Sequence, residues 1–302
     1  MELPIIQNRK YFFALSLVLV MVSIAAIGAW GLRFGIEFTG GSQLEIRFPG
    51  GQPDNAVISQ KIKEIEGIDE ALVQPSANQT VFVRLAPIDE KTHQDILSKL
   101  GELGKVEELQ FTSIGPVIGS ELRQKGVVAV VAGLFAIMLY IAWAFRTASR
   151  PVGSWQYGAV IAIVGLLHDV LIPVGAFAVL GHFFRFELGA PFIAAILTVL
   201  GFSVHDTIVV FDRTRENLRR MAKQPFEYIV NASVNQTLAR SLNTSLTLVF
   251  MVTALLLFGG ESLRSFSLVI LIGTIVGTYS SVFIASPLLV ELSRFRIPRR
   301  RS

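Results

Sequence analysis

The sequence predicts an α-helical polytopic membrane protein with six transmembrane helices and one α+β domain outside the membrane. Three observations predict this class. The 302-residue chain is 52% hydrophobic and 17% charged, with a mean hydropathy of +0.56, which is too apolar for an ordinary soluble domain. Its apolar residues gather in runs long enough to cross a hydrocarbon core about 30 Å thick. A polar segment, residues 32–125, separates the first run from the second.

Five apolar runs have the length of a membrane span: 11–31, 126–145, 157–180, 190–211 and 266–290. A sixth run, 241–258, is short unless it begins a turn or two earlier and includes Arg240. Arg9 and Lys10 precede the first run as they would in a secretory signal peptide. The apolar stretch is longer than the roughly 7–15 residues of such a peptide, so we expect an uncleaved anchor.

The positive charges of the loops predict the orientation. Fourteen Lys and Arg residues lie before the first span, between the second and third, and after the fourth and sixth. The two short loops on the other side hold only Arg185 and Arg264. This bias places both termini in the cytoplasm and residues 32–125 outside the cytoplasmic (inner) membrane. The pI near 9.5 follows from the same asymmetry and indicates no nucleic-acid partner.

The outer segment predicts a small domain in which strands and helices alternate. Alternating or β-rich stretches indicate strands, and 3.6-residue periodicity between start and stop signals indicates helices. The order β-α-β-β-α-β is that of the ferredoxin-like (split βαβ) arrangement. We therefore divide the chain into 1–33, 34–122 and 123–302. The predicted strands are 43–48, 71–74, 80–85 and 105–114, and the predicted helices are 53–67 and 90–103.

No pattern in the chain indicates an enzyme. The sequence contains no HExxH, G-x-S-x-G or P-loop motif, and it contains no cysteine. The outer domain offers one imidazole, His93, which we expect to be solvated on an exposed helix face. We expect no catalytic residues, no cofactor and no metal site.

Ionisable residues inside the predicted spans are the candidate functional residues. Each costs about 2.5–3.5 kcal/mol on insertion scales, so such residues usually face a bundle interior and often mark an ion path. The third span contains His168 and Asp169, and the fourth contains His205 and Asp206. The fifth carries a polar stripe at helical spacing that we expect to turn inward: Gln236, Arg240, Asn243, Thr244 and Thr247.

The rise per residue places two of these residues at similar depth. Asp206 lies about 9 Å and Arg240 about 6 Å above the cytoplasmic boundary, so we expect an ion pair between them. Asp169 lies deeper, at about 18 Å. Arg240 as a snorkelling side chain, and the pair as a purely structural clasp, remain open alternatives. A pair alone leaves His168, Asp169 and His205 unexplained, and groups that exchange protons beside an arginine are the components of a proton relay.

The sixth span contains Gly273 and Gly277 in a GxxxG pattern. Small residues at this spacing allow helices to approach closely. The pattern is compatible with a dimer, and packing within the chain is the favoured interpretation.

Five motifs together resemble the SecF family of bacterial protein-export subunits. They are "GIEFTGG" (35–41), "IGPVIGSEL" (114–122), "HDV" (168–170), "GFSVHDTIVVFDRTREN" (201–217) and "VNQTLARSLNTS" (234–245). The resemblance implies pairing with SecD, association with the SecYEG channel and YajC, and proton flow that drives late steps of preprotein movement. It also implies that Asp206 and Arg240 match the family's functional intramembrane aspartate and arginine.

The chain departs from that family pattern at two positions. Glu37 stands where the family usually has Asp, and His205 stands where Asn is more usual. Two alternative functions remain: a proton-coupled small-molecule or lipid transporter of the RND type, and a passive scaffold subunit of a membrane complex.

Overall fold

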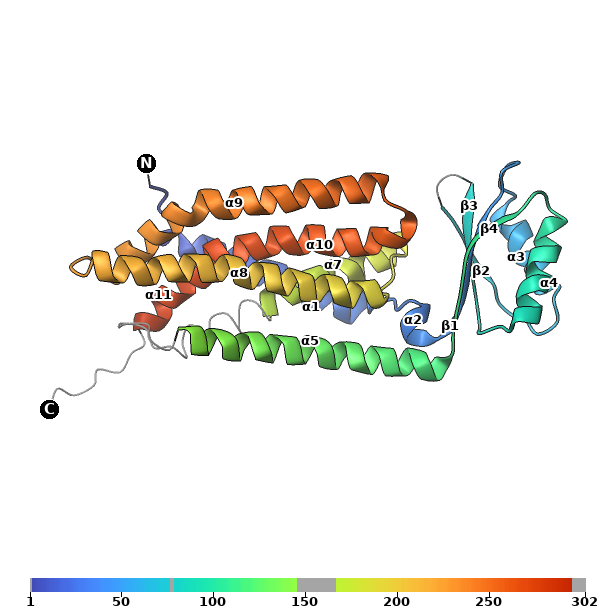
Figure 1. The fold of residues 1–302 in the computed structure, drawn as a ribbon, viewed down its shortest axis with the longest axis horizontal. Helices are drawn as coiled ribbons and strands as arrows, with labels where there is room; N and C mark the ends of the chain where they lie inside the picture. Colours follow the sequence, from blue (N-terminus) through green and yellow to red (C-terminus); the bar gives the residue numbers. More distant parts are fainter. Residues whose placement is uncertain (1, 77–78, 146–166, 295–302) are drawn as a thin grey trace. The chain divides into compact units, whose positions relative to one another are not determined.

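The computed structural model describes residues 2–76, 79–145 and 167–294. The chain divides into two units, Phe34–Val127, and Met1–Arg33 together with Val128–Ser302. We call the first the outer unit, after its predicted location, and the second the membrane unit, and describe each by itself. Figure 1 shows the elements of both.

The outer unit contains a four-stranded antiparallel sheet in the order β2-β3-β1-β4. Along the chain the strands and the two longer helices follow the predicted order. The predicted helix at 53–67 is shorter in the structure and ends at Lys63. The elements are α2 (Ile36–Thr39), β1 (Gly41–Arg47), α3 (Asn55–Lys63), β2 (Leu72–Pro75), β3 (Thr80–Leu85), α4 (Glu90–Gly101) and β4 (Glu107–Ile114).

The core of the outer unit lies between one face of the sheet and its two longer helices. Alternate residues of β1 and β3 point to this face, as the two-residue period of a strand requires. Asp54 and Asp89 cap the two helices, because their side chains accept hydrogen bonds from the backbone N–H groups of Ala56 and Thr92, each at 2.9 Å. Fully buried side chains of this core are Leu44, Ile46, Ile58, Ile62, Val81, Val83, Ile96 and Leu100.

The expectation that His93 is solvated is wrong. His93 is only 4% exposed, and its ring stacks on Phe111 with the ring centroids 3.9 Å apart. Its two nitrogens lie 3.2 Å from Glu90 and 3.1 Å from Glu108. The two carboxylates explain how an imidazole is accommodated between α4 and β4.

Among the described residues, five helical segments are long and apolar enough to cross a bilayer, and one of them, Pro116–Ala144, begins in the outer unit. The predicted third span, 157–180, falls partly on residues 157–166, which lie outside the described residues, so the sixth crossing stays a prediction. The helices are α1 (Arg9–Trp30), α5 (Pro116–Ala144), α7 (Asp169–Phe184), α8 (Ala190–Arg220), α9 (Phe226–Phe258), α10 (Glu261–Ser280), the π-helix η2 (Ser281–Ala285) and α11 (Ser286–Arg294).

The GxxxG glycines are used for packing within the chain. A Cβ atom at Gly273 would lie 2.4 Å from a methyl carbon of Val199, and one at Gly277 would lie 2.9 Å from the Cβ of Ser203. Only glycine therefore allows α10 to contact α8 this closely, which supports the packing interpretation over a dimer.

Candidate functional site

The centre of the membrane unit is a hydrogen-bonded network around Asp169, which is 0% exposed. One carboxylate oxygen lies 2.8 Å from Nδ1 of His168. The other accepts hydrogen bonds from the hydroxyls of Ser203 and, at 2.8 Å, of Ser280. The second nitrogen of His168 lies 3.0 Å from the hydroxyl of Ser16. The network thus joins residues of α1, α8 and α10 to the start of α7.

The local backbone around this network is irregular on two helices. Pro173 lies inside α7 and has no N–H to donate to the carbonyl of Asp169, four residues before it. On α10, Ser280 is the last α-helical residue before the π-helix η2. Such wide turns are frequent at functional sites because they redirect side chains and loosen the backbone ladder.

Asp206, on α8, is 2% exposed and lies beside Ser241 of α9. No hydrogen-bond partner is present for its Oδ2 atom, or for the Ser241 hydroxyl, among the described residues. Arg240 is exposed, and the described residues contain no ion pair between it and Asp206. The expected ion pair is therefore not formed here, because α9 turns Ser241, the residue after Arg240, toward α8.

Most of the predicted polar stripe on α9 does not turn inward. Gln236 accepts hydrogen bonds from Arg213 and Asn217 of α8, at 2.6 and 2.9 Å. Arg240, Asn243, Thr244 and Thr247 are all exposed, and the two threonines donate hydrogen bonds to carbonyls of their own helix. The buried polar residues of α9 lie on another face, where Ser233, Thr237, Ser241 and Ser245 follow one another at intervals of four residues.

His205 is exposed on α8 and does not belong to the Asp169 network. It lines a cavity of about 370 Å³ between α5 and α8. Tyr140 of α5 lines the same cavity, whose other walls are apolar. The structure therefore brings His168 and Asp169 together and places His205 elsewhere.

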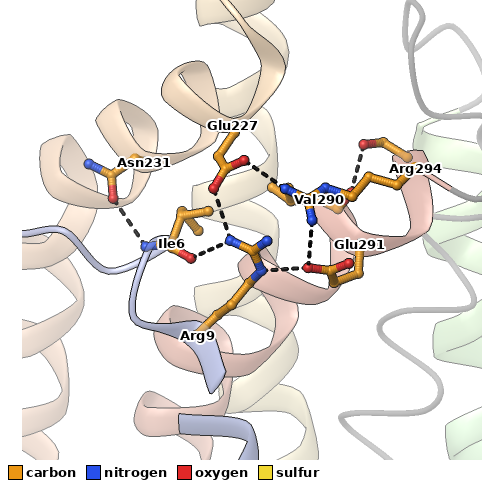
Figure 2. Close-up of polar contacts among 8 residues, drawn as sticks. Ile6, Arg9, Glu227, Asn231, Val290, Glu291 and Arg294 are labelled. Atoms are coloured by element: carbon orange, nitrogen blue, oxygen red, sulfur yellow. Dashed lines mark hydrogen bonds and ion pairs between the residues drawn. The ribbon is translucent and has the colours of Figure 1, made fainter. Parts of the chain in front are cut away.

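A second polar cluster joins the chain's N-terminal segment to α9 and α11, and Figure 2 shows it in close-up. The guanidinium of Arg9 lies 2.9 Å from Glu227 and 2.5 Å from Glu291. Arg294 contacts the same two carboxylates at 2.9 and 3.5 Å. Two arginines and two glutamates thus alternate in a closed ring, which we call the Arg9 ring. Next to it, the backbone N–H of Ile6 donates to Asn231 at 3.2 Å.

Sequence reasoning missed Ser16, Ser203, Ser241 and Ser280, the hydroxyl residues that surround the two buried aspartates. Serine is common on packed membrane helices, so its presence alone does not indicate a site. One signal was present: Ser203 precedes Asp206 by one helical turn, inside the same motif. Within the described residues, no group of three or more His, Asp or Glu side chains is arranged to hold a metal ion.

Buried carboxylates bonded to hydroxyls and an imidazole can bind and release protons. A carboxylate and a histidine exchange protons in the physiological range when their surroundings change, whereas a serine hydroxyl can pass a proton on. Inside a membrane such groups are costly to bury, and they typically form ion or proton pathways.

The chain matches two models of one protein family. Residues 93–295 match "Protein export membrane protein SecD/SecF, C-terminal", and residues 26–48 match the "SecD/SecF GG Motif". The protein translocase subunit SecF of Thermobaculum terrenum is 43% identical over 96% of this chain and 93% of that relative. The protein translocase subunit SecDF of Thermus thermophilus is 35% identical over 93% of this chain and 37% of that relative.

Solved structures agree with these matches. The crystal structure of SecDF from Thermus thermophilus, described as a translocon-associated membrane protein, superposes with a TM-score of 0.83 at 34% identity, over 98% of this chain. SecDF in its super-membrane-facing form gives a TM-score of 0.70 at 33% identity, over 97% of this chain. The chain spans 39% of the length of each of these SecDF chains. The resemblance seen in the motifs is confirmed, and the chain belongs to the SecD/SecF family of protein-export membrane proteins.

Proposed function

We propose that this chain is a SecF-type subunit of the Sec translocase, which uses the proton motive force to drive late steps of preprotein movement across the cytoplasmic membrane. The observation that carries the proposal is the buried carboxylate of Asp206. It is 2% exposed on a membrane-spanning helix, and one of its oxygens has no hydrogen-bond partner among the described residues. A buried acid in this state is stable when it is protonated and needs a counter-charge when it is not.

The mechanism we propose alternates between two arrangements of α8 and α9. When Asp206 is protonated it lies beside Ser241, as in this structure, and Arg240 remains outside. When Asp206 loses its proton, its charge attracts Arg240, and the two helices shift to form the ion pair. Proton binding and release thereby change the relative stability of the two arrangements. Asp169 and His168 form a second proton-exchanging pair in the bundle interior.

We further propose SecD as the partner that covers the exposed polar face of α9. Arg240, Asn243 and Thr247 are exposed on a helix that spans the membrane, where lipid tails offer no hydrogen bonds. A neighbouring membrane helix can satisfy them. The support for SecD is that relatives named SecDF contain a SecF-like region of this length in one longer chain. SecYEG, YajC and the translocating preprotein complete the proposed assembly.

The proposed orientation has both termini in the cytoplasm, six membrane crossings and a ferredoxin-like domain on the outer surface. The charge bias of the loops supports the orientation. The order β2-β3-β1-β4, with α3 and α4 connecting strands of one sheet, supports the domain assignment. We propose that this domain holds or releases the exported chain as the membrane helices shift, and that the chain has no enzymatic activity.

Proton flux into vesicles that contain this chain and its SecD partner tests the proposal. We expect Asp206→Asn and Arg240→Ala to abolish proton flux and the proton-driven part of preprotein export. Asp212→Asn is the matched control, because Asp212 lies on the same helix but is exposed and pairs with Arg215 at 2.8 Å. If Asp206→Asn assembles at normal levels and supports wild-type flux and export, proton coupling is refuted and the chain is a passive scaffold.

A further inference from the structure

Four buried polar side-chain atoms of the membrane unit have no hydrogen-bond partner in the described residues. They are Asp206 Oδ2, Ser241 Oγ, Ser267 Oγ and Thr274 Oγ1. All four residues are at most 2% exposed. Ser and Thr hydroxyls in helices usually donate to the carbonyl four residues earlier, as Thr198 does to Ala194 at 2.8 Å on α8. The hydroxyls of Ser241, Ser267 and Thr274 lack even this bond.

The unpartnered hydroxyls lie along one seam between helices. On α10, Ser267, Thr274 and Thr278 are spaced by seven and four residues, so they share one face of the helix. Thr278 shows which face this is, because its hydroxyl lies 2.5 Å from the hydroxyl of Ser245 on α9. Ser241 precedes Ser245 by one turn of α9 and lies beside Asp206 of α8. The seam therefore runs from the first half of α10 to Asp206.

The Ser245–Thr278 contact can hold its protons in two ways. Ser245 also lies 2.8 Å from the carbonyl of Ser241, and Thr278 lies 2.7 Å from the carbonyl of Thr274. Each hydroxyl has one proton, so two protons are available for three oxygen–oxygen contacts. Whichever hydroxyl donates across the seam leaves its own carbonyl without that bond. A hydroxyl pair that can exchange donor and acceptor roles has the property that a proton relay needs.

We propose that this seam is a proton-conducting path: the hydroxyls of Ser267, Thr274, Thr278, Ser245 and Ser241 bind water and carry protons to Asp206. The inference rests on the proposed function, because it supplies the route for the proton that Asp206 binds. In the proposed orientation α10 begins at the outer surface, so the path leads inward from outside. The ligands of the site are water and the hydrated proton.

The spacing of the hydroxyls agrees with water as the connecting ligand. Residues one turn apart are separated by about 6 Å along the axis, which one water can bridge, and Ser267 and Thr274 are about 10 Å apart, which takes two or three. A buried water needs two to four polar partners, and the seam offers four unpartnered polar atoms, those of Ser267, Thr274, Ser241 and Asp206. At each step a hydroxyl or water accepts one proton and releases its own to the next, and the last proton neutralises the Asp206 carboxylate.

The alternative role of these residues is packing, since small hydroxyl residues allow membrane helices to approach closely. The two roles differ in what they require of Thr274. Packing requires its volume, which valine shares, whereas conduction requires its hydroxyl. Replacement of threonine by valine and by serine therefore separates them.

The experiment measures proton flux into vesicles that contain the chain with its SecD partner. We expect Thr274→Val to lower the flux by about tenfold or more and Thr274→Ser to retain it, because a relay step depends on a correctly placed exchangeable proton. Thr198→Val, at an exposed hydroxyl of α8, is the matched control and should keep wild-type flux. Ser267→Ala is a second test at the outer end of the path, with the same expected loss.

Asp206→Asn in the same assay distinguishes this inference from the proposed function. If Asp206→Asn abolishes the flux while Thr274→Val and Ser267→Ala assemble normally and retain it, the path is refuted and proton coupling stands. If Asp206→Asn itself retains wild-type flux, the proposed function fails, and the path to it fails as well. If Thr274→Val does not assemble, Ser267→Ala and Thr274→Ser decide: loss in the first with retention in the second supports the path.

Discussion

The hydroxyl of Ser280, on α10, donates a hydrogen bond of 2.8 Å to the carboxylate of Asp169, at the start of α7. We predict that Ser280→Ala destabilises the protein, because it removes one of the two hydroxyls that donate to a carboxylate that water cannot reach. The expected loss in the free energy of unfolding is about 1–3 kcal/mol, measured in detergent by thermal or denaturant unfolding. Ser120→Ala, at an exposed hydroxyl that donates to its own helix, is the control and should change little. If Ser280→Ala is as stable as the wild type, the hydrogen bond between Ser280 and Asp169 does not contribute to stability.

The close contact between α10 and α8 predicts that one methyl group added at Gly273 lowers the stability of the protein. Gly273→Ala would place its Cβ 2.4 Å from Val199, so the helices must separate. We expect a loss of about 1–3 kcal/mol in the free energy of unfolding, since extra volume in a packed interface strains it. Gly28→Ala is the matched control, because a Cβ there meets nothing within 4 Å. Equal stability of the two variants would contradict the close approach.

The Arg9 ring predicts that Arg9 contributes more to the stability of the protein than the neighbouring Lys10. The side chain of Arg9 is 11% exposed, whereas Lys10 is exposed. We expect Arg9→Gln to lower the free energy of unfolding by about 1–3 kcal/mol. This is less than for a fully buried pair because Glu227 and Glu291 are 35% and 29% exposed. Lys10→Gln should leave the stability unchanged. The thermal midpoints of both variants check this, and equal midpoints would refute it.

The cap of α4 predicts a pH dependence in the outer unit. Hydrogen bonds from the side chain and the backbone N–H of Thr92 lower the pKa of Asp89 below its ordinary value of 3.8. Because the pKa is lower in the folded state, the cap stabilises α4 above pH 3.8 and loses this contribution as the pH falls through the folded-state pKa. Hydrogen exchange of α4 amides in the full chain, corrected for intrinsic rates, should show the helix opening more readily as the pH falls below about 4.

Asp89→Asn provides the control for this pH effect. Asparagine caps a helix as aspartate does but does not titrate in this range. The α4 amides of this variant should therefore show a weaker pH dependence than those of the wild type. An identical pH profile in both proteins would assign the acid sensitivity to other groups.

Hydropathy and residue spacing predicted five of the six spans and the elements of the outer unit, because both depend on patterns within a single segment. Spacing along a helix also gives depth, which placed Asp206 and Arg240 at similar heights. It does not give the rotation of one helix against another, and here Ser241 faces α8 while Arg240 is exposed. The Asp169 network could not be predicted from the sequence for the same reason. Ser203 and Ser280 contact Asp169 only when three helices are packed together.

The continuity of α9, which runs unbroken from Phe226 to Phe258, has a mechanical consequence. Consecutive residues of an α-helix point about 100° apart, so an axial rotation of that size would exchange Ser241 for Arg240 opposite Asp206. Because the helix is continuous, such a rotation would extend along its length. Glu227 lies in the first turn of α9 and pairs with Arg9 and Arg294, so a rotation of the whole helix would have to break these ion pairs.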